Sequence, residues 1–337
     1  MWAVNKITKK LSSAKGKLVI TLLALSAMIK IAFWDSENIM YDDVSRALTV
    51  ETSVCGHREQ IYDFSSKGGS KDQCNDGQCF AIAVTVNMAF YDFFVNWYHH
   101  YDDAVVRATA SHSPLLVVIA EEKELYEQLQ SDPLLKDTNT EIVLGAYATS
   151  LSSESLAFNS KEYKSMVSSR ATHLLNILCS LNALSDHGAN WNLVYSDIDT
   201  VWLKDPLPII KAKLFDGDDS NPKYDILAAV DNAELFGFTP YYCTGFLVIT
   251  STPAAMHLIS SWEGELLSKT QVNQPIFNEL VVKQKGLKYT GLSESEFVPG
   301  RNFFTHDKSR AVVLHNNFVI GREKKQKRFE EYGTWKL

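Results

Sequence analysis

Two aspartates placed two residues apart are the strongest chemical signal in this sequence. Asp197 and Asp199 follow the mainly apolar run 191–196. Side chains two apart on an extended chain point the same way, so the two carboxylates can converge on one divalent ion. Clustered carboxylates repel each other unless a cation or a shared proton lies between them. The pair therefore predicts a metal site. The alternative is a turn in which the carboxylates only cap the segment before Pro206.

A histidine near the C-terminus could complete this site. His315 follows four apolar residues, 311–314, that predict a short strand. A histidine in that position is often only a hydrogen-bonded residue at a sheet edge. Combined with two carboxylates, however, its imidazole gives a mixed oxygen and nitrogen ligand set. That set suits Mn²⁺ or Mg²⁺ and leaves coordination positions open for phosphate oxygens.

Lysine and arginine are concentrated in the segment Gly321–Arg328, one short loop after His315. Its simplest explanation is a helix face in contact with solvent. Its position also allows a second explanation, in which a lysine or the helix N-terminus neutralises a diphosphate leaving group. The sequence leaves both explanations open.

The motif around Asp197 also matches the phosphoaspartate motif of haloacid dehalogenase-like phosphatases. In those enzymes the first aspartate is the nucleophile and the second is an acid/base. Their motif normally opens the domain on its first strand, whereas here more than a hundred residues of apparent α/β fold precede Asp197. The order of elements therefore argues against a phosphatase without excluding it.

Apolar runs and helical periodicities alternate along the chain, which predicts βαβ units on a mostly parallel sheet. The carboxylates follow a buried strand of this sheet, where open α/β sheets usually bind ligands. Besides the run before Asp197, the expected strands are 80–86, 115–120, 141–147, 224–230, 245–250 and 311–314. The expected helices are 88–101, 121–130, 163–184, 252–267 and 274–284, with one more after Pro206 and a basic helix at the end.

Composition limits the classes of function. The chain has 337 residues, of which 45% are hydrophobic and 22% charged, so it can bury a full core. Its net charge of -7 gives no general attraction to nucleic acid, and we expect no nucleic-acid partner.

Five cysteines are compatible with a secretory location. Cys74 and Cys79 bracket a turn-forming insert, which makes a local disulfide plausible, and Cys55 could pair elsewhere. Cys179 lies in an apolar helical stretch and is interpreted as a buried thiol.

The N-terminus predicts membrane attachment. Lysines precede a mostly apolar run, 18–34, and acidic residues follow it, which is typical of a type II orientation. The run is at the short end of the roughly 17–25 residues that a spanning helix needs. A cleaved signal peptide is the alternative. The expected organisation is a cytoplasmic tail at 1–17, an anchor at 18–34, a polar stem at 35–78 and a catalytic domain at 79–337.

Together these segments resemble the nucleotide-diphospho-sugar transferase domain of glycosyltransferase family 77, which is related to glycogenin-like and galactosyltransferase-like enzymes. The resemblance covers about three quarters of the chain, from Phe80 to the C-terminus. It depends on four blocks in order: 195–206 around the aspartates, 244–249 (Thr-Gly-Phe-Leu-Val-Ile), 273–280 (Asn-Gln-Pro-Ile-Phe-Asn-Glu-Leu) and 315–324 from the histidine onward. It implies a GT-A type Rossmann-like nucleotide-sugar-binding fold with a mostly parallel central sheet.

The resemblance also implies roles for individual residues on the donor side. The loop that receives the nucleoside matches Thr85, Val86 and Asn87. The metal-binding residues match Asp197, Asp199 and His315, and Asp197 is also placed to meet the ribose. Lys324 is the nearest match to the lysine that contacts the diphosphate, with Lys325 one step away. Arg170 resembles a basic donor-side residue of related enzymes.

On the acceptor side and at the reaction centre, the resemblance points to Asp231 and Gln274. Two positions depart from the family pattern. Many relatives have an aspartate where this chain has Asn273, and an asparagine where it has Cys243. The first difference puts in doubt any role for a carboxylate at position 273, and the second affects the acceptor side.

The resemblance implies a glycosyltransferase that moves a sugar from a UDP-sugar to a hydroxyl of a glycan or glycoprotein, using Mn²⁺ or Mg²⁺ and retaining the anomeric configuration. Similar enzymes are type II proteins of the Golgi membrane with a lumenal catalytic domain. Two other classes remain open. One is the phosphatase that uses Asp197, and the other is a membrane-anchored binding protein that has lost activity. The sequence does not identify the sugar or the acceptor.

Overall fold

The structure is a computed structural model that describes residues 54–56, 58, 62–64, 74, 78–108, 113–136, 138–145, 160–184, 190–215, 221–232, 237–268 and 272–337. These residues all belong to one compact unit, Val54–Leu337. The predicted tail (1–17) and anchor (18–34) lie outside the described residues. Within the described part of the chain, no helix combines the length and the apolar character that crossing a bilayer requires.

In the described chain, seven strands form the main sheet in the order β3-β2-β1-β4-β7-β6-β8. All neighbouring strands are parallel except β7, which runs antiparallel to β4 and to β6. The expected α/β class and the mostly parallel sheet are therefore confirmed. The strands are β1 (Gln78–Val86), β2 (Leu115–Ala120), β3 (Thr140–Leu144), β4 (Asn190–Ser196), β6 (Ile226–Asn232), β7 (Tyr241–Thr250) and β8 (Tyr289–Gly291).

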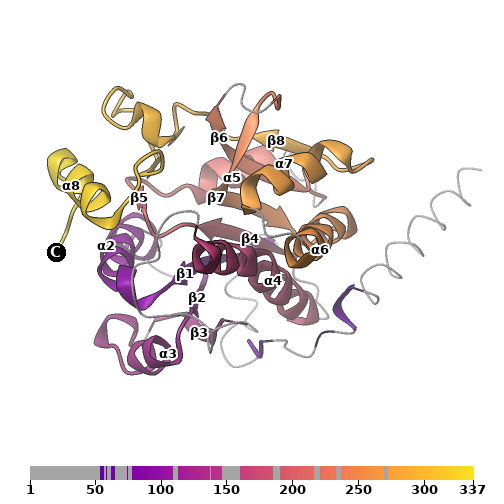
Figure 1. The fold of residues 1–337 in the computed structure, drawn as a ribbon, viewed down its shortest axis with the longest axis horizontal. Helices are drawn as coiled ribbons and strands as arrows, with labels where there is room; N and C mark the ends of the chain where they lie inside the picture. The colour runs from indigo at the N-terminus through magenta and orange to yellow at the C-terminus, as the bar shows by residue number, and fades with distance from the viewer. Residues whose placement is uncertain are drawn as a thin grey trace, which may run out of the picture. The chain divides into compact units, whose positions relative to one another are not determined.

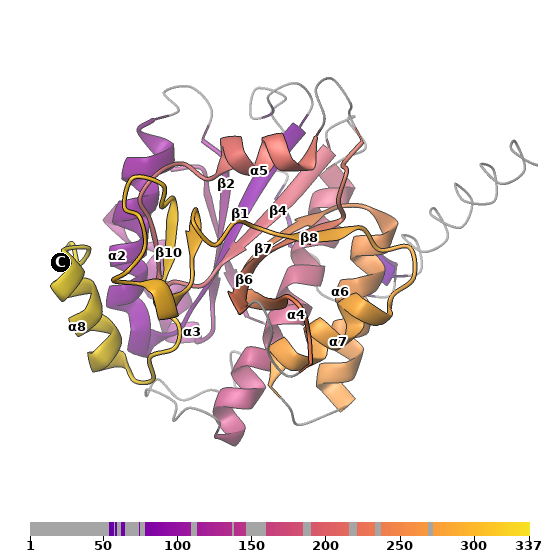
Figure 2. The same ribbon diagram turned by 90° about the horizontal axis from the view of Figure 1, so that it is seen from above.

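Helices cover both faces of this sheet, as Figures 1 and 2 show. Alternate residues of β1 point to opposite faces because side chains alternate along a strand. Ala81 and Ala83 pack under α4, α6 and α7, whereas Ile82 and Val84 pack against α2 and the small sheet described below. The helices are α2 (Tyr91–Tyr101), α3 (Lys123–Gln130), α4 (Lys161–Leu184), α5 (Leu207–Leu214), α6 (Pro253–Ser268), α7 (Asn273–Lys283) and α8 (Arg322–Tyr332).

A second, three-stranded sheet was not expected from the sequence. Its order is β5-β10-β9, with β5 (Thr200–Trp202) antiparallel to β10 (Val313–His315) and β10 parallel to β9 (Phe297–Val298). Trp202 of β5 lies edge-on to Trp97 and Tyr101 of α2, which stack on each other. This aromatic cluster holds the small sheet against the main domain.

The main sheet contains a change of direction that matters for ligand binding. The strands β1, β2 and β3 proceed outward in one direction, and β4 lies on the other side of β1. Adjacent strands whose connections leave in opposite directions open a crevice at their carboxyl ends. Asn87 follows β1 and Asp197 follows β4 at this edge.

Part of the segment predicted as a stem packs on the folded unit. Cys55 forms a disulfide with Cys179 of α4, so the interpretation of Cys179 as a buried free thiol was wrong. A cysteine on the apolar face of a helix has the same sequence pattern whether it is reduced or paired. Arg58 bonds Glu263 of α6, and Phe64 is buried. The expected disulfide between Cys74 and Cys79 is confirmed.

The two disulfides should contribute unequally to stability. The Cys55–Cys179 bond joins residues 124 apart in sequence, whereas Cys74 and Cys79 are 5 apart. Because a cross-link lowers the entropy of the unfolded chain more when it closes a longer loop, Cys55→Ala with Cys179→Ala should cost about 5 kcal/mol of unfolding free energy. The Cys74→Ala/Cys79→Ala control should cost about 2 kcal/mol. Urea denaturation of the oxidised proteins measures both, and equal losses would contradict the loop argument.

Candidate active site

The two aspartates lie on a tight turn between the two sheets. Strand β4 ends at Ser196, and the backbone N–H of Thr200 donates to the carbonyl of Asp197 (3.2 Å) before the chain enters β5. The backbone N–H of Asp197 donates to the carbonyl of Gly245 on β7 (2.8 Å). The carboxylates therefore converge because of a turn, and not through the extended backbone that their spacing suggested.

His315 reaches the aspartates through the small sheet. Strand β10 places His315 opposite Thr200 of β5, and the N–H of Asn316 donates to the carbonyl of Asp199 (2.9 Å). The imidazole Nε2 lies 3.3 Å from Asp199 Oδ1 and 3.8 Å from Asp197 Oδ2. The ligand atoms of the three residues lie within 4.8 Å of one another. The structure thus brings together the three residues expected to bind a metal ion.

Each carboxylate also has its second oxygen bound by a cationic side chain. Arg170 of α4 donates from Nη2 to Asp197 Oδ1 (2.6 Å), which also accepts from the hydroxyl of Tyr195 (2.9 Å). Lys325 of α8 donates from Nζ to Asp199 Oδ2. The remaining oxygens, Asp197 Oδ2 and Asp199 Oδ1, are the ones that face His315. Two oxygens and one nitrogen directed at a common centre fit Mn²⁺ or Mg²⁺.

Burial and opposite charges act against each other in this cluster. Burial would raise the pKa of Asp199, but Lys325 and His315 hold that pKa well below its usual range. Burial would lower the pKa of His315, but the sulfur of Cys243 and the carboxylate of Asp199 raise it well above its usual value. The pKa of Lys325 is likewise raised by Asp199 despite burial. Lys325 and His315 thus favour the ionised form of Asp199 against the effect of burial.

The structure brings Lys325, and not the predicted Lys324, to the acidic pair. Lys324 is exposed on α8. Helix α8 starts after Gly321, whose φ of 99° lies in the left-handed region that favours glycine. Asn316 fixes the helix to the site, since its side-chain Nδ2 donates to the carbonyl of Lys325 (2.8 Å). The residue at which the helix begins therefore determines that Lys325, and not Lys324, faces the aspartates.

The predicted acceptor-side residues form a hydrogen-bonded chain beside the aspartates. Asp231, near the end of β6, accepts from Gln274 Nε2 (2.6 Å) and from Asn317 Nδ2 (2.5 Å). Gln274 Oε1 accepts from the backbone N–H of Thr244 (3.4 Å), and the carbonyl of Thr244 accepts from Arg170 Nη1 (3.0 Å). The donor-side and acceptor-side predictions thus lie in one network. Asn317 and Thr244 were not predicted.

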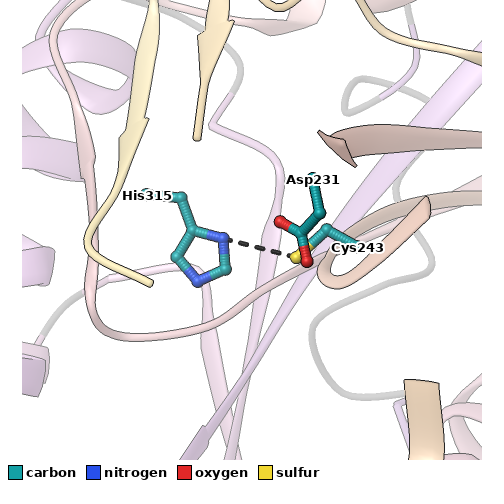
Figure 3. Close-up of side chains that lie close together, drawn as sticks. All are labelled: Asp231, Cys243 and His315. Atoms are coloured by element: carbon teal, nitrogen blue, oxygen red, sulfur yellow. Dashed lines mark hydrogen bonds between the residues drawn. The ribbon is translucent and has the colours of Figure 1, made fainter. Parts of the chain in front are cut away.

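A second group of possible ligands shares His315. Figure 3 shows Asp231, Cys243 and His315 close together, with Nδ1 of the imidazole 3.5 Å from the sulfur. This set is less suited to Mn²⁺ or Mg²⁺ because it contains a thiol, and burial raises the pKa of Cys243 to about 11. Both oxygens of Asp231 are also already engaged by amide donors. The group that contains Asp197 and Asp199 is therefore the better fit for such an ion.

The loop expected to receive the nucleoside lies at the end of β1. The Thr85 hydroxyl oxygen accepts a long hydrogen bond from Tyr195 (3.5 Å), next to Asp197. Val86 is fully buried in the apolar core, so its side chain is not available to a ligand. Asn87 is buried beside Met166 of α4. The role of this loop stays a prediction. Asn273 is directed away from the acidic pair, since its side-chain amide donates to the carbonyl of Val167 on α4 (3.2 Å).

Sequence reasoning missed a buried acidic residue behind the site. Glu121 was expected at the start of a charged helix, but α3 begins at Lys123 and Glu121 is fully buried between β2 and α4. One oxygen accepts from Ser169 (3.3 Å) and lies 3.6 Å from His173, whereas the other has no hydrogen-bond partner. Burial raises the pKa of Glu121 to about 8 and lowers that of His173 to about 3.

This raised pKa should make stability depend on pH. Between its unfolded value and about 8, Glu121 binds more protons in the folded than in the unfolded chain, so stability falls as pH rises through this window. From about pH 6.5 to 8, the free energy of unfolding of the wild type should fall by about 2 kcal/mol relative to that of Glu121→Gln. His173 is neutral in the folded chain over this range and loses its charge in the unfolded one, and this contribution is common to both proteins. Urea denaturation at both pH values measures this difference. The exposed Glu124→Gln control should follow the wild type, and a parallel pH profile for Glu121→Gln would contradict the assignment.

Gly245 leaves the space that His315 and Asp197 occupy. A Cβ at this position would lie 2.4 Å from His315 Cε1 and 2.5 Å from Asp197 Oδ2. Gly245→Ala should therefore displace these groups and weaken Mn²⁺ binding by about 10- to 100-fold, measured by electron paramagnetic resonance. Gly264→Ala is the control because its Cβ meets nothing within 4 Å. Unchanged Mn²⁺ affinity in Gly245→Ala would show that the ion does not bind at Asp197 and His315.

Known proteins agree with the sequence-based resemblance. A UDP-D-xylose:L-fucose alpha-1,3-D-xylosyltransferase of Arabidopsis thaliana is 24% identical over 349 residues, which cover 96% of this chain and 87% of the relative. UDP-D-xylose:L-fucose alpha-1,3-D-xylosyltransferase 3 of the same plant is 27% identical over 200 residues, and the match covers 53% of this chain and 49% of the relative. The chain thus spans only about half the length of that second protein.

The galactosyltransferase LgtC, solved in complex with donor and acceptor sugar analogues, superimposes with a TM-score of 0.47 and 12% identity, covering 76% of this chain and 96% of LgtC. The family of nucleotide-diphospho-sugar transferases matches residues 112–329, which contain both aspartates, Gln274, His315 and Lys325. This match spans well over half of the chain, and the chain therefore belongs to the nucleotide-diphospho-sugar transferase family.

Proposed function

We propose that this protein is a metal-dependent glycosyltransferase that moves a sugar from a UDP-sugar to a hydroxyl of a glycan or glycoprotein. The observation that carries the proposal is the arrangement of the two aspartates. Each has one oxygen bound by a cationic side chain and the other directed at His315 Nε2. This arrangement lies at the carboxyl end of β4, where α/β sheets bind nucleotides.

Xylose is our first candidate for the transferred sugar, and a fucosyl residue is our first candidate for the acceptor. Both come from the names of the plant relatives, which are xylosyltransferases that use UDP-D-xylose and L-fucose. The same names give an alpha-1,3 linkage. Because UDP-xylose is itself α-linked, an α-linked product means retention of the anomeric configuration. Metal dependence and retention are part of the proposal.

Asp197, Asp199 and His315 would hold the Mn²⁺ or Mg²⁺ ion. When bound, the ion supplies a Lewis acid that stabilises the negative charge of the departing diphosphate. The chain adds fixed positive charge at the same place. Arg170 and Lys325 lie against the two carboxylates, and Lys325 replaces Lys324 as our candidate for the diphosphate contact. Charges that are fixed before the reaction stabilise a transition state at little cost in reorganisation.

Gln274 and Asp231 define the other side of the reaction centre. The amide of Gln274 is held in one orientation, because Nε2 donates to Asp231 and Oε1 accepts from Thr244. Asp231 is held in turn by Asn317. We propose that Gln274 lies next to the anomeric carbon and that Asp231 orients it and the incoming hydroxyl. An orientation fixed in this way raises the rate by limiting the geometries that the reactants sample.

The two other classes of function are less well supported. Membership in the nucleotide-diphospho-sugar transferase family does not favour a phosphatase. An inactive binding protein would keep the fold and lose turnover, which only an assay can decide. Two disulfides support an oxidising compartment such as the Golgi lumen, with attachment through the predicted anchor.

The decisive variant is Asp199→Asn. It removes one negative charge from the centre of the cluster but keeps the shape of the side chain, so the fold should survive. Mn²⁺-dependent release of UDP from UDP-xylose should fall by about 100-fold or more. Asp205→Asn is the matched control, because Asp205 accepts from the N–H of Leu207 at the start of α5 and lies outside the cluster.

The assay also separates the alternatives. Full Mn²⁺-dependent activity in Asp199→Asn would refute the metal assignment. Hydrolysis of phosphate monoesters by the wild type would favour the phosphatase, and UDP binding without transfer to any acceptor would favour the inactive binding protein. A panel of UDP-sugars in the same assay identifies the donor.

A further inference from the structure

His315 presents a different nitrogen to each of two neighbouring groups. Its Nε2 faces Asp197 and Asp199, and its Nδ1 lies 3.5 Å from the sulfur of Cys243. Figure 3 shows the Nδ1 side of the ring, with the sulfur of Cys243 next to that nitrogen. Neutral imidazole has one N–H and one free nitrogen, and only the free nitrogen can bind a metal ion. The hydrogen bond at Nδ1 therefore decides what Nε2 can do.

The sulfur of Cys243 is placed to accept hydrogen bonds. The backbone N–H of Gly245 lies 3.4 Å from it, and the amide Nδ2 of Asn317 lies 3.8 Å from it. Both groups can only donate. The orientation of the Asn317 amide is fixed independently, because its Oδ1 accepts from the N–H of Gly300 (2.6 Å). Two donors besides His315 thus already lie near the sulfur.

The hydrogen of the thiol can turn away from His315. The carboxylate of Asp231 belongs to the same close group as the sulfur and the imidazole. A carboxylate is a stronger acceptor than a neutral ring nitrogen. When the S–H turns toward this carboxylate, whose ligand oxygen lies within 4.8 Å of the sulfur, the sulfur can accept from the Nδ1–H of His315. This leaves Nε2 without a hydrogen once an ion takes the place of the proton there.

We propose that Cys243 is a positioning residue that holds His315 in the tautomer and ring orientation in which Nε2 serves as a metal ligand. The inference depends on the proposed function, since it needs an ion at Asp197, Asp199 and His315. It adds a role for a residue outside the ligand set. Groups that hydrogen-bond the second nitrogen of a histidine ligand typically contribute 10- to 100-fold to metal affinity.

The test compares acceptors of different chemistry at position 243. Cys243→Ala and Cys243→Val both remove the acceptor, although alanine leaves space and valine fills it. Cys243→Ser keeps an acceptor of similar size. Mn²⁺ affinity of the full chain, measured by electron paramagnetic resonance with and without UDP, should fall by about 10- to 100-fold in the first two variants and be restored in Cys243→Ser. Thermal denaturation confirms that each variant folds.

A steady-state assay adds a readout that packing alone would not move. In Cys243→Ala the Mn²⁺ concentration for half-maximal activity should rise, whereas kcat at saturating Mn²⁺ should stay close to the wild-type value. Unchanged Mn²⁺ affinity in Cys243→Ala, or equal losses in the alanine and serine variants, would overturn the proposal. If the wild type binds no Mn²⁺ at all, then the metal site of the proposed function fails, and the role of Cys243 fails with it. A wild type that binds Mn²⁺ while Cys243→Ala binds it equally well overturns only the inference.

Discussion

The repulsion between the carboxylates of Asp197 and Asp199 is the constraint that the other residues of the site compensate. Two carboxylates can share a buried turn only if positive charge compensates them. Here Arg170, Lys325 and His315 supply that charge, and each contacts a different side of the pair. They come from α4, β10 and α8, and α4 is far from the other two in sequence. The site therefore depends on the packing of the whole domain and cannot form from the Asp-x-Asp segment alone.

The small sheet sets the geometry of the turn. Strand β5 begins immediately after Asp199, and its Trp202 lies in the aromatic cluster with Trp97 and Tyr101. The indole N–H of Trp202 donates to the hydroxyl of Ser196 (3.3 Å), which is also bonded to Thr200 (2.8 Å). Buried aromatic contacts on one face of the main sheet thus fix the backbone on both sides of the aspartates. A rigid turn keeps two oxygens directed at His315.

Long buried elements were predictable from the sequence, whereas of the small sheet only the strand at 311–314, which corresponds to β10, was predicted. The predicted strand 115–120 agrees with β2, and the predicted helix 163–184 agrees with α4 (Lys161–Leu184), because an apolar run or a helical period extends over many residues. The strands of the small sheet have two or three residues each, too few to show a period. Glu121 was assigned to a charged helix because the sequence does not show that its carboxylate is buried.

The composition of the site was easier to predict than its contacts. The spacing of Asp197 and Asp199 and the position of His315 after an apolar strand indicated the three residues that the structure brings together. The choice between Lys324 and Lys325 depends on the residue at which α8 begins, and spacing alone cannot give that phase. The disulfide of Cys55 with Cys179 depends on a three-dimensional contact across 124 residues, which the sequence pattern does not contain.

The hydrogen-bonded chain from Arg170 through Thr244 and Gln274 to Asp231 connects the residues that we propose for the two substrate sides. Asp231 is then linked through Asn317 to the segment that carries His315. The network therefore starts at one aspartate of the pair and returns to the histidine that faces both. Because buried hydrogen bonds in such a chain polarise and orient one another, a shift of one group changes the others. If the proposed function holds, we expect the acceptor hydroxyl and the leaving diphosphate to be positioned together, since the groups proposed for the two sides belong to one hydrogen-bonded network.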